Sequence, residues 1–304
     1  MVKELKMKIG DTLRFFRTLK GFTQKEVLKS STDHSIYSRI ENGKRSVRLE
    51  ELQEILDTLS VNIEEFISFS GFDTNQGVFR KNFYGAAADL EDLEKKAIVI
   101  KYYREILATP KKTTVQLSNL VSIKAFFSQF WSEVVPVTQE EIQEAYDLLS
   151  NTDYLSQYDY ALLANIVFQF PTEQRKVLMK KAYPIMDQSL RDPETLKLAY
   201  NAIPNAMTAC IQEKQYDEGK EYAKMIDTIE KSAKNVHIIM NIKYLENLIY
   251  LITTGDRSYQ KKINRYIDIL QEHGFTAIAE ASDKEMRILT FGEIDKGDVP
   301  INTM

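Results

Sequence analysis

Residues 22–46, FTQKEVLKSSTDHSIYSRIENGKRS, concentrate side chains that could contact a polyanion. Amide, hydroxyl and guanidinium groups donate hydrogen bonds to phosphate oxygens and to base edges, and Arg39 could donate two parallel bonds to guanine O6 and N7. The three histidines, His34, His237 and His273, are scattered and lack the spacing of metal ligands. The chemistry that this stretch suggests is therefore nucleic acid binding.

The distribution of charge along the chain supports this interpretation. Residues 1–48 contain 12 basic and 5 acidic residues, a net charge of +7, and the remaining 28 basic and 39 acidic residues carry −11, which together give the overall −4. The basic segment at residues 1–48, called the head below, is therefore the part of the chain expected to bind a polyanion, and the acidic rest of the chain is not.

Length and composition predict a helical protein of two domains in the cytoplasm. The 304 residues are 43% hydrophobic and 28% charged, with only 11 Gly and 7 Pro. There is neither an apolar stretch long enough for a transmembrane helix nor a secretory signal. The single cysteine, Cys210, favours a reducing compartment; we interpret it as a buried thiol, with a redox switch or an intersubunit disulfide as the alternative.

No enzyme is expected. The chain lacks G-x-x-x-x-G-K, G-x-G-x-x-G, H-E-x-x-H and paired C-x-x-C motifs. Acidic pairs such as Glu140-Glu141 stand at predicted helix starts, where they favour the helix dipole. We therefore expect no cofactor, no metal and no catalytic residue.

Periodicity and capping signals place the head residues on short helices. Apolar residues three and four apart predict a first helix in which Leu5, Ile9, Leu13, Phe16 and Leu19 face inward. Gly21 ends it, and Thr23 to Glu26 form a capping box that starts the second. The five predicted helices span residues 5–20, 24–29, 33–41, 49–59 and 61–69.

The rest of the chain predicts stacked helical hairpins. Residues 71–88 contain three glycines and weak periodicity, which suggests a linker between a domain at 1–70 and a domain at 89–304. Residues 205–229 and 246–270 share a layout typical of tetratricopeptide-like repeats. The predicted helices span residues 89–108, 113–131, 139–150, 155–170, 172–189, 194–213, 216–231, 234–253, 257–273 and 276–290.

The head resembles the Xre-type helix-turn-helix of the lambda and 434 repressors. The resemblance rests on T-Q-K-E-V-L followed by Y-S-R-I-E-N-G-K and covers residues 8–67. It implies a lambda-repressor-like domain that binds operator DNA, expected to be palindromic, as one half of a dimer. The DNA-binding residues that the resemblance implies, together with the basic cluster beside them, are Thr23, Gln24, Asp33, His34, Ser35, Ser38, Arg39, Asn42, Lys44 and Arg45. Asp33 could instead serve as a helix N-cap, and His34 could contact a phosphate, contact a base or be simply exposed.

The same resemblance implies a structural ion pair between Arg17 and Glu41. The order of a helix-turn-helix and about 220 residues of helices also resembles the Rgg/GadR/MutR regulators, in the RRNPP-like group related to PlcR and PrgX. This implies a homodimeric transcription factor for quorum sensing, controlled by a short signalling peptide bound in the concave groove of an all-α repeat domain.

Four asparagines are candidate peptide contacts, because one side-chain amide can accept a hydrogen bond from an N–H group and donate one to a C=O group of an extended peptide. They are Asn165, Asn201, Asn205 and Asn241, whose alternative role is as exposed or interhelix polar residues. Phe168, Phe170 and Tyr244 could line apolar pockets but are favoured as core. Two other functions remain open, a ligand-independent Xre-family repressor with a helical dimerisation domain and a regulator that acts through protein interactions.

Overall fold

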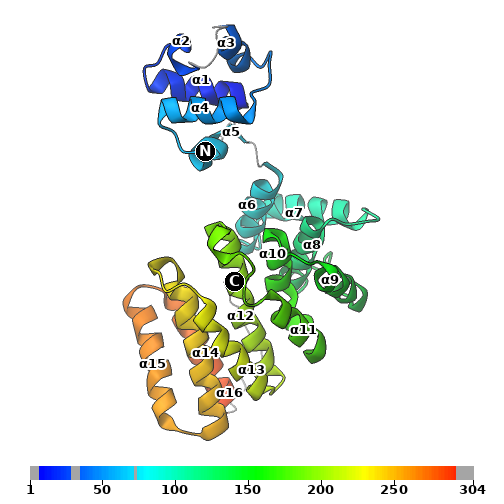
Figure 1. The fold of residues 1–304 in the computed structure, drawn as a ribbon. Helices are drawn as coiled ribbons and strands as arrows, with labels where there is room; N and C mark the ends of the chain where they lie inside the picture. Colours follow the sequence, from blue (N-terminus) through cyan, green and yellow to red (C-terminus); the bar gives the residue numbers. More distant parts are fainter. Residues whose placement is uncertain (1–6, 29–34, 72–73, 292–304) are drawn as a thin grey trace. The chain divides into compact units, whose positions relative to one another are not determined.

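The computed structural model describes residues 7–28, 35–71 and 74–291, and every regular element within these ranges is helical (Figure 1). The chain divides into two compact units, Met1–Val99 and Ile100–Met304. The division falls inside helix α7 (Leu93–Leu107), whereas the sequence placed the second domain from residue 89. None of the described helices is both long enough and apolar enough to cross a bilayer.

The N-terminal unit contains five short helices around one core. They are α1 (Ile9–Leu19), α2 (Gln24–Val27), α3 (Ser35–Glu41), α4 (Leu49–Leu59) and α5 (Ile63–Ser70). Leu13, Phe16, Tyr37 and Ile40 are buried, as their spacing predicted, but Leu19 is 67% exposed and its predicted inward position is wrong. Leu19 is the last residue of α1, beyond the stretch that contacts the other helices.

Gly10 allows α1 to pack closely against the end of α3. A Cβ at this position would lie 2.5 Å from the Ile40 carbonyl oxygen, so a larger residue would force the two helices apart. Gly21 follows α1 with φ +76°, a left-handed conformation that glycine adopts without strain. Glu26 accepts hydrogen bonds from the backbone N–H and the hydroxyl of Thr23, both at 2.7 Å, which fixes the start of α2.

The segment expected as a linker contains a helix of its own, α6 (Thr74–Ala88). The helix was not predicted, because its sequence contains glycines and its apolar residues show little helical periodicity.

The C-terminal unit has two layers of helices that alternate along the chain. Successive even-numbered helices contact one another and form one layer, the even layer, and the odd-numbered helices between them form the odd layer (Figure 1). The even layer comprises α8 (Thr114–Phe127), α10 (Gln157–Ile166), α12 (Pro193–Gln212), α14 (Val236–Thr254) and α16 (Thr276–Phe291). The odd layer comprises α9 (Gln139–Asn151), α11 (Thr172–Ala182), α13 (Tyr216–Ala223) and α15 (Arg257–Glu272).

Two odd helices end earlier than their periodicity predicted. The prediction carried the helix of α11 to residue 189, but α11 ends at Ala182 because Pro184 disfavours helical geometry at the residue before it. Tyr183 is accordingly extended, with φ −131° and ψ 136°. The prediction carried α13 to residue 231, whereas residues Lys224–Thr228 continue as a 3-10 helix.

Candidate DNA-binding surface and even-layer face

A buried glutamate organises the helix-turn-helix. Glu41, the last residue of α3, has a side chain with no exposed surface, and Arg17 Nε of α1 lies 2.6 Å from its Oε1. Arg17 also donates to the Phe22 carbonyl oxygen, and Gln24 Nε2 donates to Glu41 Oε2 at 2.7 Å. One carboxylate therefore holds together α1, the start of α2 and the end of α3.

The hydrogen bonds to Glu41 keep it charged. Burial alone would raise the pKa of this carboxyl group, but the hydrogen bonds from Arg17 and Gln24 lower it below the ordinary value. Gln24 was predicted to bind a phosphate, and the structure uses one of its two amide hydrogens internally. The other amide hydrogen makes no hydrogen bond in the described part of the chain, so the predicted phosphate contact stays a prediction.

The turn after α3 is fixed by side chains as well. Asn42 Nδ2 donates to the Ser38 carbonyl oxygen at 2.7 Å, and Asn42 Oδ1 accepts from Arg14 Nη2 at 2.7 Å. Arg45 pairs with Glu51 of α4, with 2.7 Å between Nη2 and Oε1. Asn42 and Arg45 thus position this turn, and the sequence did not single out Arg14.

The predicted DNA contacts lie in three places. Thr23 and Gln24 stand at the start of α2, Asp33 and His34 lie outside the described residues, and the others follow α3 and its turn. Ser35, Arg39, Asn42 and Lys44 are exposed, while Ser38 and Arg45 are half-buried. The exposed members of the set can reach a ligand without any rearrangement of the core.

In the even layer, two of the four predicted asparagines join neighbouring helices. Asn165 Nδ2 of α10 donates to the Ser122 hydroxyl of α8 at 2.8 Å, and Asn205 Nδ2 of α12 donates to the Ala164 carbonyl oxygen of α10 at 2.8 Å. This is the interhelix role that the sequence left open. Asn201 and Asn241 are half-buried and make no hydrogen bond within the described part of the chain.

The even layer carries few charges in α8, α10, α12 and α14, whereas α16 carries five. Four of its helices have at most one basic and one acidic residue each; the charged side chains are Lys124, Asp159, Glu194, Lys197, Lys243 and Glu246. Phe170 and Tyr244 are buried, which agrees with the core role favoured for them. Cys210 is fully buried as well, and burial raises the pKa of its thiol to about 12.

A buried arginine, which the sequence analysis missed, joins α11 to the end of α12 and to α13. Arg175 of α11 has no exposed surface; its Nη2 lies 2.6 Å from Glu213 Oε2 and its Nε lies 3.3 Å from Glu218 Oε1. Its Nη1 donates to the Phe170 carbonyl oxygen. The available signal was its position three residues before Leu178 on the apolar face of the helix.

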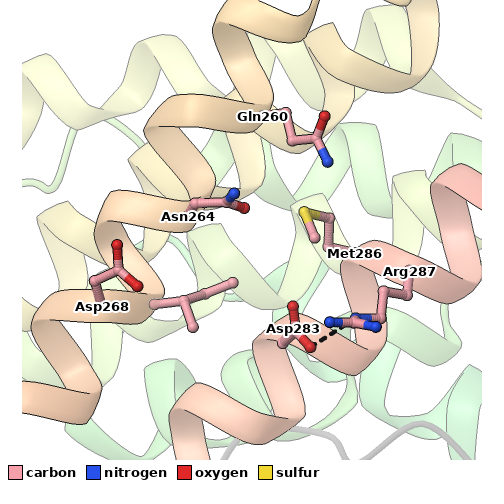
Figure 2. A pocket seen from close by; sticks show the side chains of 7 residues that line it. Gln260, Asn264, Asp268, Asp283, Met286 and Arg287 are labelled. Atoms are coloured by element: carbon pink, nitrogen blue, oxygen red, sulfur yellow. Dashed lines mark ion pairs between the residues drawn. The ribbon is translucent and has the colours of Figure 1, made fainter.

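A surface cavity of about 350 Å³ lies between α15 and α16 (Figure 2). Arg287 and Asp283 form an ion pair along α16, with 2.7 Å between Nε and Oδ2. The lining residues are Gln260, Asn264, Ile267, Asp268, Asp283, Met286 and Arg287. None of them was a predicted peptide contact.

Comparison with known proteins gives two family matches along the chain. Residues 91–284 match the C-terminal domain of the HTH-type transcriptional regulator Rgg, and residues 13–66 match a helix-turn-helix family. No curated protein matches the chain by sequence.

Solved structures share the fold over nearly the whole chain. The PrgX/cCF10 complex has a TM-score of 0.77 at 18% identity and covers 96% of this chain and 95% of its own. The SHP pheromone receptor Rgg2 of Streptococcus dysgalactiae has a TM-score of 0.75 at 19% identity, with coverages of 92% and 99%. A bacterial peptide pheromone/receptor complex has a TM-score of 0.76 at 19% identity, and the match covers 92% of this chain and 98% of the other. Since the Rgg domain spans most of the chain, the protein belongs to the Rgg family of helix-turn-helix transcriptional regulators.

Proposed function

We propose that this chain is a homodimeric, sequence-specific DNA-binding regulator whose activity is set by a short signalling peptide bound on the even layer. The N-terminal unit reads one operator half-site through α3 and its turn. The C-terminal unit holds two copies together and senses the peptide. As a DNA-binding regulator, it acts in the cytoplasm.

The observation that carries the peptide proposal is the low charge of α8, α10, α12 and α14 in the even layer. An apolar, extended peptide needs a face with little charge and with amides that both donate and accept hydrogen bonds. Asn201 and Asn241 supply such amides on α12 and α14. Solved structures with this fold include pheromone complexes of PrgX and of a bacterial receptor, which supports the same ligand class.

Isothermal titration calorimetry can test peptide binding. The titrants are synthetic short hydrophobic peptides encoded by open reading frames beside the gene. We expect one of them to release or absorb heat with the full chain and to lose affinity with the Asn201→Ala/Asn241→Ala variant. The matched control is Asn264→Ala, on α15 and outside the proposed face. Absence of heat with every candidate, together with operator binding that culture supernatant leaves unchanged, would favour the ligand-independent repressor.

A further inference from the structure

The odd layer concentrates charge, and its sign alternates from helix to helix. Helix α9 contains four acidic residues and no basic one, and α11 contains four basic residues and one acidic. Helix α13 has three acidic residues and one basic, and α15 has four basic residues and two acidic. The net charges along the layer are therefore −4, +3, −2 and +2. Without Glu141, Arg175 and Glu218, which are paired and at most 14% exposed, they are −3, +2, −1 and +2, so the alternation of sign is kept at the surface.

Side-chain contacts establish the order of these helices. Gln174 of α11 donates to Gln143 of α9 at 3.1 Å, and Arg175 of α11 pairs with Glu218 of α13. Helices α13 and α15 are connected through α14: Lys220 Nζ lies 5.7 Å from the centre of the Tyr250 ring, which stacks on Tyr259. The alternating charges therefore belong to helices that follow one another along the layer, with α14 between α13 and α15.

Most of the exposed charges at the two ends of the layer have no ion-pair partner among the described residues, although Glu141 of α9 pairs with Lys124 of α8. None of seven exposed side chains forms an ion pair within 4 Å of another described residue; they are Glu140, Glu144 and Asp147 of α9 and Arg257, Lys261, Lys262 and Arg265 of α15. Arg257 lies in the first turn of α15, where the helix dipole disfavours positive charge. Local helix stability does not account for the position of this residue.

We infer that the odd layer is the surface through which two copies of this chain associate, with the layers antiparallel about a twofold axis. In this arrangement α9 of each copy faces α15 of the other, and α11 faces α13. Every facing pair then has opposite charges, whereas a parallel arrangement would set like charges against each other. The inference rests on the homodimer of the proposed function and names its surface.

The physics of such a surface predicts a salt-sensitive dimer. Complementary charges mainly set register and association rate, and they are screened beyond about 10 Å at 0.1 M salt. The apolar contribution comes from side chains such as Val177 of α11, which is 49% exposed among lysines. We therefore expect the two copies to separate more readily as salt rises.

Sedimentation equilibrium of the full chain at low and high salt can test the surface. Reversal of α15 (Lys261→Glu/Lys262→Glu/Arg265→Glu) or of α9 (Glu140→Lys/Glu144→Lys/Asp147→Lys) should each weaken the dimer at least about tenfold. Mixing the two reversed chains should restore association. In that heterodimer the unchanged α9 faces the unchanged α15, and the reversed α9 faces the reversed α15, so both contacts are complementary in charge. The control, Lys197→Glu/Lys243→Glu, reverses exposed charges of the even layer and should leave the dimer unchanged.

Several results would overturn the inference. These are a wild-type chain that stays monomeric, a dimer that neither reversal weakens, and reversed chains that weaken but do not associate when mixed. Assemblies that keep growing with concentration would indicate head-to-tail contacts instead of a closed dimer. Calorimetry with the peptides is read separately, so a failure of this surface is distinguishable from a failure of peptide sensing.

Discussion

Each unit of this protein contains an arginine–glutamate site that holds several elements together, and the two sites differ in which partner is buried. In the N-terminal unit, Arg17 and Gln24 both donate to Glu41. In the C-terminal unit, Arg175 is itself fully buried and donates to Glu213 and Glu218. If the arginine is lost, Glu41 keeps the Gln24 amide as a donor, whereas Glu213 and Glu218 keep only the hydroxyls of Thr172 and Tyr222 and the half-exposed Lys176. Because Arg175 is fully buried and joins two glutamates, the second site depends more strongly on its arginine.

The largest expected effect follows from this dependence. Arg175→Ala leaves Glu218, which is only 8% exposed, beside an unfilled space, so we expect a loss of about 3–5 kcal/mol in the stability of the C-terminal unit. Urea denaturation monitored by circular dichroism would measure it. Lys180→Ala is the matched control, because that lysine is exposed on the same helix and forms no ion pair with a described residue. Equal stabilities for the two variants would contradict the role given to Arg175.

The equivalent change in the N-terminal unit should cost less. Arg17→Ala removes two hydrogen bonds to Glu41 but leaves Gln24 as a donor, so we expect a loss of about 1.5–3 kcal/mol. Lys20→Ala, at the exposed end of α1, serves as control. Unfolding of this unit and operator binding would be measured together. If Arg17→Ala cost more than Arg175→Ala, the comparison between the two sites would fail.

Two exposed residues near α3 should separate base contact from phosphate contact. We expect Arg39→Ala to lose about 1–3 kcal/mol of operator affinity and to relax preference at one base pair. Lys44→Ala should weaken binding to all sequences and reduce the salt dependence. Fluorescence anisotropy with operator variants would measure both. Unchanged affinity in both variants would mean that the recognition helix is misassigned.

The smallest expected effect concerns pH, and its sign differs between the units. Hydrogen bonds lower the pKa of Glu41, so its stabilising contribution is present above the ordinary value of 4.5 and is lost as pH falls below it. Burial raises the pKa of Glu285, which lies 2.8 Å from the Tyr244 hydroxyl. Its contribution is complete below 4.5 and is lost as pH rises through the raised value.

Denaturation from pH 3 to 8 would check both signs. In the Glu285→Gln variant, the decrease in stability of the C-terminal unit on the alkaline side should be smaller than in the wild type. An unchanged pH profile would show that Glu285 titrates at its ordinary value.

The sequence predicted the helices well because their caps and periodicity are local. The predicted span 49–59 coincides with α4. Gly21, which was predicted to end the first helix, follows directly after the C-cap residue of α1, Lys20. The predictions were less accurate where a distant contact decides the outcome. Periodicity does not show that Asn205 reaches the Ala164 carbonyl oxygen, or that Arg175 meets two glutamates about 40 residues away.

The helix-turn-helix was more predictable than the even layer for the same reason. Its motif fixes Arg17, Gln24 and Glu41 at set spacings, whereas degenerate repeats fix the helix pattern and leave the polar positions free. The α6 helix and the early end of α11 show the same limit, since each depends on glycine or proline geometry more than on apolar spacing.

The most direct test of the central claim is a titration of operator DNA with the full chain, with and without the peptide identified by calorimetry. If the even layer controls the N-terminal unit, saturating peptide should change operator affinity by about 5–150-fold. The Asn201→Ala/Asn241→Ala variant should bind DNA normally and lose that response. A peptide that binds tightly but leaves operator affinity unchanged would contradict the account.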